Sequence, residues 1–402
     1  MKKYKLILDK DTFLWLKTNE GIIYQSKNFQ SFIFSLSDKL LKICSHLLEI
    51  DNLYAIKVTE NDLDNEDVRT FFDKIVSIGA GRLIQDTGAE KGAVSLLPVL
   101  TIEEGVNYHV NSHKRVIDSG IGHYVHEITF YINGSKHGND KYYRQVIFPM
   151  ESELILESEK IVRFIKNNRN PYLFNINIVG NIFAYPEYCD LLDNIMTFKF
   201  PVTICISSGD FLDNKDLLKR TEWHKKVSFH ILIEKKTDIG LVVKSLTEVD
   251  TPISNTVFVF SEQDCFDIEH ILETLNSDIV PVYNGENLDF FKSSVFVNQE
   301  DILASTLTKR EIFMRQVVNT HHFGKLTVLP DGVVYADVNK EPLGMIDDSV
   351  YSIVYKEITE GESWFRIRDQ KPCSDCIYQW LCPSPSNYET AIGRQNLCHV
   401  VS

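Results

Sequence analysis

Four cysteines near the C-terminus have the residue type and the spacing of a metal-ligand set. They are Cys373, Cys376, Cys382 and Cys398, and they fall within 26 residues in the pattern Cys-x2-Cys-x5-Cys-x15-Cys. Four thiolates suit either a zinc ion or a 4Fe-4S cluster, and spacing alone does not choose between them. We expect one 4Fe-4S cluster at these residues, with zinc as the alternative and unmetallated thiols as the third possibility.

The other cysteines, Cys44, Cys189, Cys205 and Cys265, stand singly, and we expect ordinary buried thiols there. The sequence has no signal-peptide pattern and no apolar run near the roughly 18 residues of a membrane span. We therefore expect a cytoplasmic protein without a membrane partner. In that compartment clustered cysteines bind metal rather than pair as disulfides.

Length and composition allow a multidomain globular protein. With 402 residues, of which 44% are hydrophobic, the chain can form two or three cores. The net charge of -14 argues against a nucleic-acid partner, because phosphate binding needs a basic surface. The stretch Gly79-Ala80-Gly81 is the best early candidate for a domain boundary.

The first 80 residues have the pattern of a small α+β domain. Short apolar runs predict strands at residues 4–8, 13–16 and 22–24, followed by a helix at 34–48 and an extended segment at 53–58. A second helix is predicted with Asp64 as its N-cap, because apolar residues recur there at helical spacing. These apolar positions are Val68, Phe71, Phe72, Ile75 and Val76.

A three-stranded sheet followed by helices resembles the winged-helix peptide-recognition elements of maturases that modify ribosomally synthesised peptides. This resemblance implies that a leader peptide adds a strand to the sheet edge, with backbone hydrogen bonds supplying the affinity. The peptide-binding residues expected here are Ile22, Ile23, Tyr24, Phe71 and Phe72. The other interpretation is a winged-helix cap that serves only packing or dimerisation.

From residue 125 onward, strands and helices alternate. Strands are predicted at residues 128–132, 173–179, 202–206, 227–233, 257–260 and 279–282, with helices at 154–165 and 268–275. This alternation predicts an α/β fold with a parallel sheet or a partial (β/α) barrel. Residues 81–124 are expected to connect the two parts, and residues 96–102 within them read as a strand.

Residues 125–402 resemble a radical S-adenosylmethionine (SAM) protein with a C-terminal SPASM extension, but the SAM-binding devices are missing. In that family the first barrel strand leads into Cys-x3-Cys-x2-Cys, whereas residues 133–141 here read Asn-Gly-Ser-Lys-His-Gly-Asn-Asp-Lys. The family's Gly-Gly-Glu-Pro segment corresponds to a stretch in which Ile182 replaces the carboxylate. The resemblance implies a degenerate barrel at 125–310 that uses no SAM, and a SPASM-like cluster-binding domain at 311–402.

Compared with the family pattern, the SPASM-like part lacks the cysteines of one auxiliary cluster and has those of the other. By resemblance, His322, Asp337 and Ser386 stand at three cysteine positions of the first auxiliary cluster, whereas the four C-terminal cysteines match the ligands of the second. A cluster with every iron ligated by protein implies structural support or electron relay. His321 and His322 with Asp337 also form a candidate metal site, for which a solvated turn is the other interpretation.

These features predict a noncatalytic protein, and no catalytic residue is assigned. The resemblance implies a partner of a radical SAM peptide maturase that binds the maturase, the precursor peptide or both, as a homo- or heterodimer. Positioning a substrate lowers a reaction barrier without any reacting group on the partner. Two other functions remain open, namely a zinc-stabilised binding or assembly protein, and an enzyme with a new SAM-independent site in the barrel.

Overall fold

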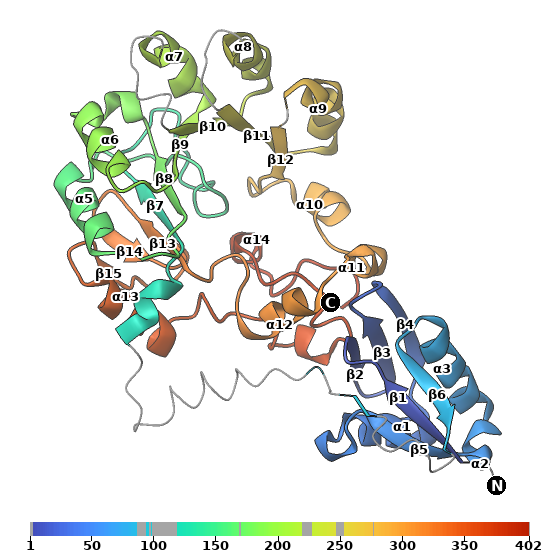
Figure 1. Ribbon diagram of the computed structural model, residues 1–402. Coiled ribbons are helices and arrows are strands. Elements are labelled where there is room, and N and C mark those ends of the chain that lie inside the picture. The colour runs from blue at the N-terminus through green and yellow to red at the C-terminus, as the bar shows by residue number, and fades with distance from the viewer. Residues whose placement is uncertain are drawn as a thin grey trace.

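The computed structural model describes residues 3–86, 94, 95, 98, 119–168, 170–218, 227–246, 253–275 and 277–401. Its elements form a large arc of strands and helices and a smaller N-terminal domain, with the C-terminal segment between them (Figure 1). The fold is mixed α/β, as predicted. Apart from Pro98, the predicted strand at residues 96–102 lies outside the described residues.

One nine-stranded sheet organises the large arc, in the order β12-β11-β10-β9-β8-β7-β13-β14-β15. Its strands are β7 (Glu127–Tyr131), β8 (Asn175–Val179), β9 (Val202–Ser207), β10 (Ser228–Ile233), β11 (Ile253–Val259), β12 (Ser277–Pro281), β13 (Lys325–Val328), β14 (Val333–Tyr335) and β15 (Gly344–Met345). The six predicted strands are confirmed as β7 to β12, which pair in parallel in sequence order. Because β13 pairs in parallel with β7, the sheet continues across the division predicted at residue 310.

Helices cover the outer face of this sheet (Figure 1). They are α5 (Ser158–Asn167), α6 (Tyr188–Met196), α7 (Ser208–Leu218), α8 (Lys236–Leu246) and α9 (Glu262–Leu275). Phe130 of β7 packs edge-on against Phe164 of α5, and both are buried in the main core. The helix predicted from residue 154 begins only at Ser158, because Ile155 pairs with Asn133 in an isolated antiparallel bridge.

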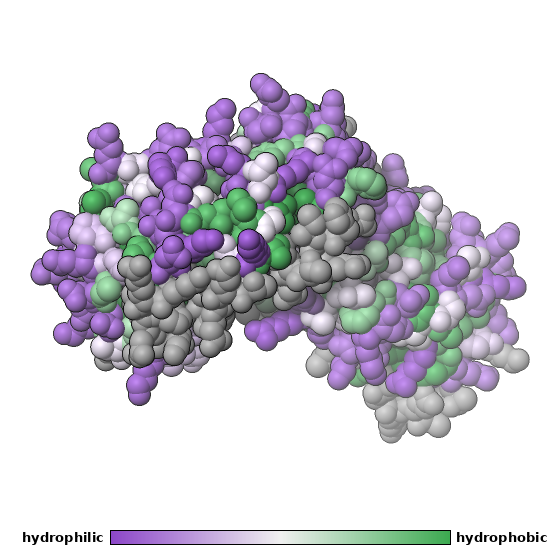
Figure 2. All heavy atoms as spheres, turned by 90° about the horizontal axis from the view of Figure 1, so that it is seen from above, coloured by the Kyte–Doolittle hydropathy of each residue, from purple (hydrophilic) through white to green (hydrophobic). Residues whose placement is uncertain are grey.

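The concave face of the sheet carries polar side chains. Asn177 of β8 donates from Nδ2 to the Thr129 hydroxyl of β7 at 3.2 Å. Farther along the sheet, the two ring nitrogens of His230 lie 2.7 Å from the Ser254 hydroxyl and 2.9 Å from the Thr256 hydroxyl. Seen from above, hydrophilic residues cover most of the visible surface, with hydrophobic residues gathered in patches between them (Figure 2).

The N-terminal domain contains two three-stranded sheets, in the orders β5-β1-β6 and β2-β3-β4, rather than the single sheet predicted. Their strands are β1 (Lys3–Leu8), β2 (Thr12–Leu16), β3 (Glu20–Gln25), β4 (Gln30–Ser35), β5 (Ala55–Thr59) and β6 (Gly81–Gln85). The turn after β1, closed by a 3.0 Å bond from the Thr12 N–H to the Asp9 carbonyl, separates β1 from β2. Later strands β5 and β6 then occupy both edges of β1.

A strand replaces the start of the helix predicted at residues 34–48. Helix α1 (Asp38–Leu48) begins only after β4, with the Ser37 side chain as its N-cap. Phe32 and Phe34 of β4 both pack against Phe71, with ring centroids 5.9 and 4.6 Å away. Residues two apart in sequence face the same side in a strand but not in a helix. These contacts therefore favour a strand at β4 over a helix that begins at residue 34.

Helices α2 (Glu60–Leu63) and α3 (Glu66–Ser77) complete the N-terminal domain. The N-cap of α3 is Asn65 rather than the predicted Asp64, and its side chain accepts a hydrogen bond from the Val68 N–H at 3.1 Å. The predicted apolar face is buried except at Val76, which is 48% exposed. The apolar periodicity therefore located the helix correctly, whereas the predicted N-cap was wrong by one residue.

The N-terminal domain packs directly against the C-terminal half of the chain. That half contains α10 (Leu288–Ser294), α11 (Gln299–Ala304), α12 (Lys309–Val317), α13 (Val350–Glu360) and α14 (Asn387–Ile392). Phe13 of β2 and Tyr24 of β3 share one hydrophobic core with Ile312 of α12 and with Cys376. None of the helices in the described part of the chain combines the length and the apolar character that a membrane crossing needs.

Replacing Tyr24 with phenylalanine is expected to lower the free energy of unfolding by about 1.5 kcal/mol. The Tyr24 hydroxyl donates to the Leu307 carbonyl at 2.9 Å and accepts from the Leu307 N–H at 2.7 Å, and the side chain is 1% exposed. Urea-induced unfolding measures the loss. Tyr172→Phe, at a residue that is 59% exposed, is the control and should change stability by less than about 0.5 kcal/mol. Equal losses in both variants would contradict the contact between Tyr24 of the N-terminal domain and Leu307.

Candidate functional site

The fold gathers the four C-terminal cysteines in one region. Cys373 begins a short 3-10 helix, Cys373–Asp375, and Cys376 follows it directly, so that both thiols are buried. Cys398 comes from the end of the chain and is placed by a parallel bridge to Val297. Each of the first three thiols interacts electrostatically with Cys398. The residues selected by spacing therefore also converge in space.

Two of these sulfur atoms each have a nitrogen donor nearby. Arg368 Nη1 lies 3.8 Å from Cys373 Sγ, and Asn396 Nδ2 lies 3.4 Å from Cys398 Sγ. The other end of the Arg368 guanidinium pairs with Glu389 at 2.7 Å, and both side chains are nearly buried. Hydrogen bonds to sulfur tune the reduction potential of an iron-sulfur cluster, so Arg368 and Asn396 would act in that way if these cysteines held such a cluster.

Burial makes the thiols poor acids in the absence of a metal. It raises the pKa of Cys382 to about 12 and also raises the pKa values of Cys373 and Cys376. The Arg368 charge acts in the opposite direction on Cys373 and Cys382. A bound ion or cluster would supply the positive charge that stabilises thiolates here, so metal binding and proton release are coupled.

The donor set fits a 4Fe-4S cluster or a zinc ion by residue type, because either group takes four thiolates. Within the described residues, no three His, Cys, Asp or Glu side chains are arranged as a ready site for a metal ion. The cysteines are thus gathered without being held in the geometry of a single ion. A measurement of the iron, sulfide and zinc content of the purified protein would decide which group the four cysteines bind.

The N-terminal domain touches the cysteine-bearing segment directly. Lys17, just after β2, donates from Nζ to the Ser374 carbonyl at 2.5 Å and to the Gln379 side-chain oxygen at 3.0 Å. Gln379 in turn donates to the Arg368 carbonyl at 2.8 Å. This chain of hydrogen bonds links the position of the N-terminal domain to the loop that carries Cys373 and its neighbours.

The structure places the predicted peptide-binding residues in the protein core. Ile22, Ile23 and Tyr24 lie on β3, the central strand of its sheet, and Phe71 and Phe72 lie on α3. None of the five is more than 2% exposed. Because β2 and β4 occupy both edges of β3, neither these side chains nor the β3 backbone faces an incoming peptide in this conformation.

A basic groove beside β5 was not found from the sequence. It has a volume of about 450 Å³ and lies between α1 and β5, which is an edge strand of its sheet. Its lining contains three lysines, Lys5, Lys42 and Lys57, against one acidic residue, Asp51. The lysines are far apart in sequence, so only the pairing of β1 with β5 reveals the cluster.

Hydrogen bonds fix the loop at residues 133–141, where the resemblance placed the missing cluster cysteines. The hydroxyl groups of Ser135 and Ser207 both donate to Asp210 Oδ2, the second at 2.8 Å, and Asn181 Nδ2 donates to Oδ1 at 2.9 Å. Asp210 is fully buried. The Asn133 amide also bonds the Asn181 backbone twice, each time at 2.9 Å. A polar network thus holds this loop against β8, β9 and α7.

Ile182, the residue matched to the family's SAM-binding carboxylate, is a core residue. It begins the short 3-10 helix Ile182–Ala184 and is fully buried in the main hydrophobic cluster. The preceding turn requires Gly180, whose φ is +131° and whose added Cβ would lie 2.4 Å from Asn133 Oδ1. The segment therefore keeps its turn, but its side chain at 182 contributes to packing.

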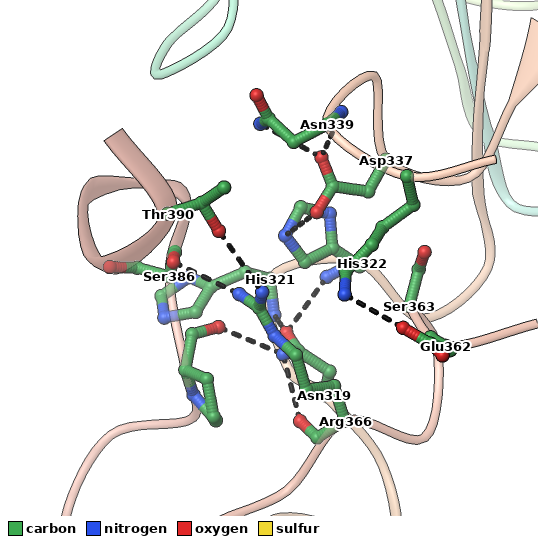
Figure 3. Close-up of polar contacts among 12 residues, drawn as sticks. Asn319, His321, His322, Asp337, Asn339, Glu362, Ser363, Arg366, Ser386 and Thr390 are labelled. Carbon is green, nitrogen blue, oxygen red and sulfur yellow. Dashed lines mark hydrogen bonds and ion pairs between the residues drawn. The ribbon is translucent and has the colours of Figure 1, made fainter. Parts of the chain in front are cut away.

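The three positions matched to the first auxiliary cluster come together. His322 points toward Asp337, with 3.7 Å between His322 Nε2 and Asp337 Oδ2, and both are buried (Figure 3). Burial lowers the pKa of His322, and the Asp337 charge opposes that shift. Ser386 lines the same cavity. His321 is exposed, so the predicted solvated turn describes His321 but not its neighbour.

The cavity beside His322 and Asp337 has a volume of about 290 Å³. Its wall includes Thr129 of β7, Thr327 of β13 and the aromatic ring of Tyr143. It therefore lies where the concave sheet face meets the C-terminal segment. Asn387, the first residue of α14, also lines it and was not identified from the sequence.

No protein-family model matches the chain, and no curated protein matches it. Among solved structures, Streptococcus suis SuiB bound to precursor peptide SuiA is similar over 98% of this chain and 98% of that chain, with a TM-score of 0.47 and 11% identity. Streptococcus suis SuiB bound to S-adenosylmethionine is similar over 97% of each chain, with a TM-score of 0.41 and 12% identity.

Proposed function

We propose that this protein is a noncatalytic, peptide-binding partner of a radical SAM maturase that modifies a ribosomally synthesised precursor. The N-terminal domain takes an acidic, extended segment of the precursor in the groove beside β5. The large arc and the C-terminal segment present that segment to the maturase. One 4Fe-4S cluster at the four C-terminal cysteines gives structural support or relays electrons, and zinc is the alternative occupant.

The groove beside β5 is the observation that carries this proposal. A peptide in extended form gains backbone hydrogen bonds by adding to an edge strand, and within the described residues only β1 pairs with β5. Ile43 of α1 and Ile56 of β5 line the groove and offer apolar contact for alternate peptide side chains. A strand edge without a partner strand among the described residues, a helix wall and apolar contacts together favour a peptide occupant.

The positive charge of the groove favours an acidic occupant. Lys5 and Lys57 stand directly opposite each other in the β1–β5 register, an arrangement of like charges that destabilises a sheet. Lys42 of α1 adds a third positive charge to the same groove. On a chain with a net charge of -14, this local excess of lysine favours carboxylate-bearing ligands and raises their rate of encounter.

The barrel residues support the noncatalytic part of the proposal. The loop at 133–141 contributes Ser135 to a buried hydrogen-bond network with Asp210, and Ile182 contributes a core side chain. Neither segment offers thiolates for a SAM-cleaving cluster or a carboxylate for the SAM amino group. An enzyme with a different, SAM-independent site stays an alternative, as does a zinc-stabilised assembly protein.

Reversing lysine charges in the groove is expected to weaken binding of an acidic peptide. We expect Lys42→Glu and Lys57→Glu each to raise the dissociation constant of a fluorescein-labelled acidic 15-residue peptide by about tenfold, as measured by anisotropy. Lys74→Glu, on the exposed side of α3, makes the same charge change and should alter the affinity less than about twofold. Equal effects of all three variants would show that net charge, not the groove, controls binding.

A complex with a maturase is the second expectation. The protein is mixed with a radical SAM peptide maturase and the precursor peptide of that maturase, both from the same organism as this protein, and size-exclusion chromatography and titration report association. The proposal predicts a complex with at least one of them. Absence of binding to both would remove the proposal, whatever the metal content of the cysteine site.

A further inference from the structure

Helix α1 and strand β5 lie side by side and form the walls of the groove beside β5 (Figure 1). The two elements run in opposite directions. At one end, Lys39 Nζ near the start of α1 lies 3.1 Å from Asp62 Oδ1, after the end of β5. At the other end, Asn52 Nδ2, before the start of β5, donates to the His46 carbonyl near the end of α1 at 2.7 Å. These two contacts fix the order of the groove residues from one end to the other.

The charged residues that line the groove are divided between its two ends. Lys57 of β5 stands opposite Lys5 of β1, and Lys42 of α1 lies one helical turn after Lys39. These three lining lysines therefore mark a basic end, toward the end of β5. Asp51, in the turn before β5, lines the opposite, acidic end. Within the described residues, none of these four lining side chains forms an ion pair, so each charge can act on a ligand.

Neighbouring charges preserve this difference between the two ends. Near the acidic end, a second carboxylate, that of Glu49, accepts from Asn52 Nδ2 at 2.8 Å. It also lies 3.9 Å from His46 Nε2, so it balances the charge of that imidazole when the ring is protonated. Near the basic end, Asp62 is already paired with Lys39. The groove therefore favours a negative peptide residue at one end and a positive one at the other.

Three successive residues of β5, Ala55, Ile56 and Lys57, line the groove. Pairing along this edge begins at Ala55, because the Leu53 carbonyl already accepts from the Ser95 N–H at 2.9 Å. A peptide strand added to β5 therefore places three successive residues opposite this lining. Because side chains alternate along a strand, the two outer peptide residues share the side of Lys57 and the middle one shares the side of Ile56.

We infer that the groove selects the order acidic, apolar, basic, read from the N- to the C-terminus of an extended peptide that pairs antiparallel with β5. Antiparallel pairing is more stable per residue than parallel pairing and is the pairing of β1 with β5. The acidic residue then stands opposite Lys57, and the apolar residue meets Ile56 and Ile43. The basic residue stands opposite Ala55, whose small side chain leaves room for a long cationic side chain to reach Asp51.

This inference rests on the peptide groove proposed above and adds the order and the direction in which the peptide is read. Two fluorescein-labelled 15-residue peptides that differ only in a central triplet, Glu-Leu-Lys or Lys-Leu-Glu, test it by anisotropy with the full-length protein. Their composition and net charge are identical. We expect the Glu-Leu-Lys peptide to bind about fivefold more tightly. A preference for Lys-Leu-Glu would overturn the inference.

Asp51→Lys tests the acidic end directly. The variant should lose the preference for Glu-Leu-Lys and should bind a Glu-Leu-Glu peptide about fivefold more tightly than the wild type does. Asp73→Lys, on the exposed side of α3, makes the same charge change and should keep the preference of the wild type. Equal affinity of the wild type for both ordered peptides, with Lys57→Glu still weakening both, would overturn the order but not the groove. Absence of binding to any of these peptides would overturn both.

Discussion

Cys376→Ala is expected to abolish metal binding at the C-terminal cysteines. Anaerobically purified wild type should carry about four irons and four sulfides per chain for a 4Fe-4S cluster, or about one zinc without sulfide, and the variant should carry neither. Removing one of four thiolates leaves an incomplete ligand set around a buried positive charge. About eight irons in the wild type would contradict the expectation of a single cluster.

The same substitution is expected to loosen the N-terminal domain. Cys376 shares a hydrophobic core with Phe13 and Tyr24, and the neighbouring Ser374 carbonyl accepts from Lys17. Because metal binding stabilises the fold of a small cysteine-rich segment, its loss should disorder the surface on which β2 and β3 rest. Hydrogen exchange measured by mass spectrometry should become faster in peptides covering β2 and β3.

Cys189→Ala is the matched control for this experiment. The prediction of a buried thiol was wrong for Cys189, which is exposed because it lies in the first turn of the surface helix α6. It stands singly there, so the variant should keep the metal content and the exchange rates of the wild type. Loss of metal in Cys376→Ala without faster exchange in β2 and β3 would separate the metal site from the docking of the N-terminal domain. Lys17 would then hold the domain independently of the metal.

Asp210→Ala is expected to lower the free energy of unfolding by about 4 kcal/mol. The buried carboxylate accepts from Ser135, Ser207 and Asn181, which come from a loop, the end of β9 and the end of β8. Alanine would leave these donors without their acceptor and would open a cavity at the edge of the sheet. Urea-induced unfolding followed by circular dichroism measures the loss.

Asp213→Ala, one helical turn later on α7, provides the comparison. Asp213 pairs with Lys136 of the same loop at 2.5 Å, but the two side chains are 51% and 67% exposed. Solvent screens such a pair, so its loss should destabilise the protein far less than the loss of Asp210 does. Similar losses in the two variants would show that the loop at 133–141 is held by surface charge rather than by the buried network.

The arc of parallel strands was predictable because its signal is local. Each of β7 to β12 is a short apolar run, and apolar residues at helical spacing mark the segments between them, so residues near in sequence carry the pattern. The N-terminal domain departs from prediction where pairing depends on distant segments. Nothing within residues 3–8 indicates that β1 pairs with β5 and β6, so the sequence suggested one sheet where two exist.

Residue type and spacing determined that four cysteines near the C-terminus form a candidate ligand set and that strands and helices alternate from residue 125 onward. Only the tertiary structure decided which side chains distant in sequence meet. It buried the predicted peptide-binding strand β3, set Lys57 opposite Lys5, and brought Asn387 to His322 and Asp337. Spacing along a chain reports ligands that lie close in sequence, whereas these groups meet only because strands and loops far apart in sequence share one sheet and one cavity.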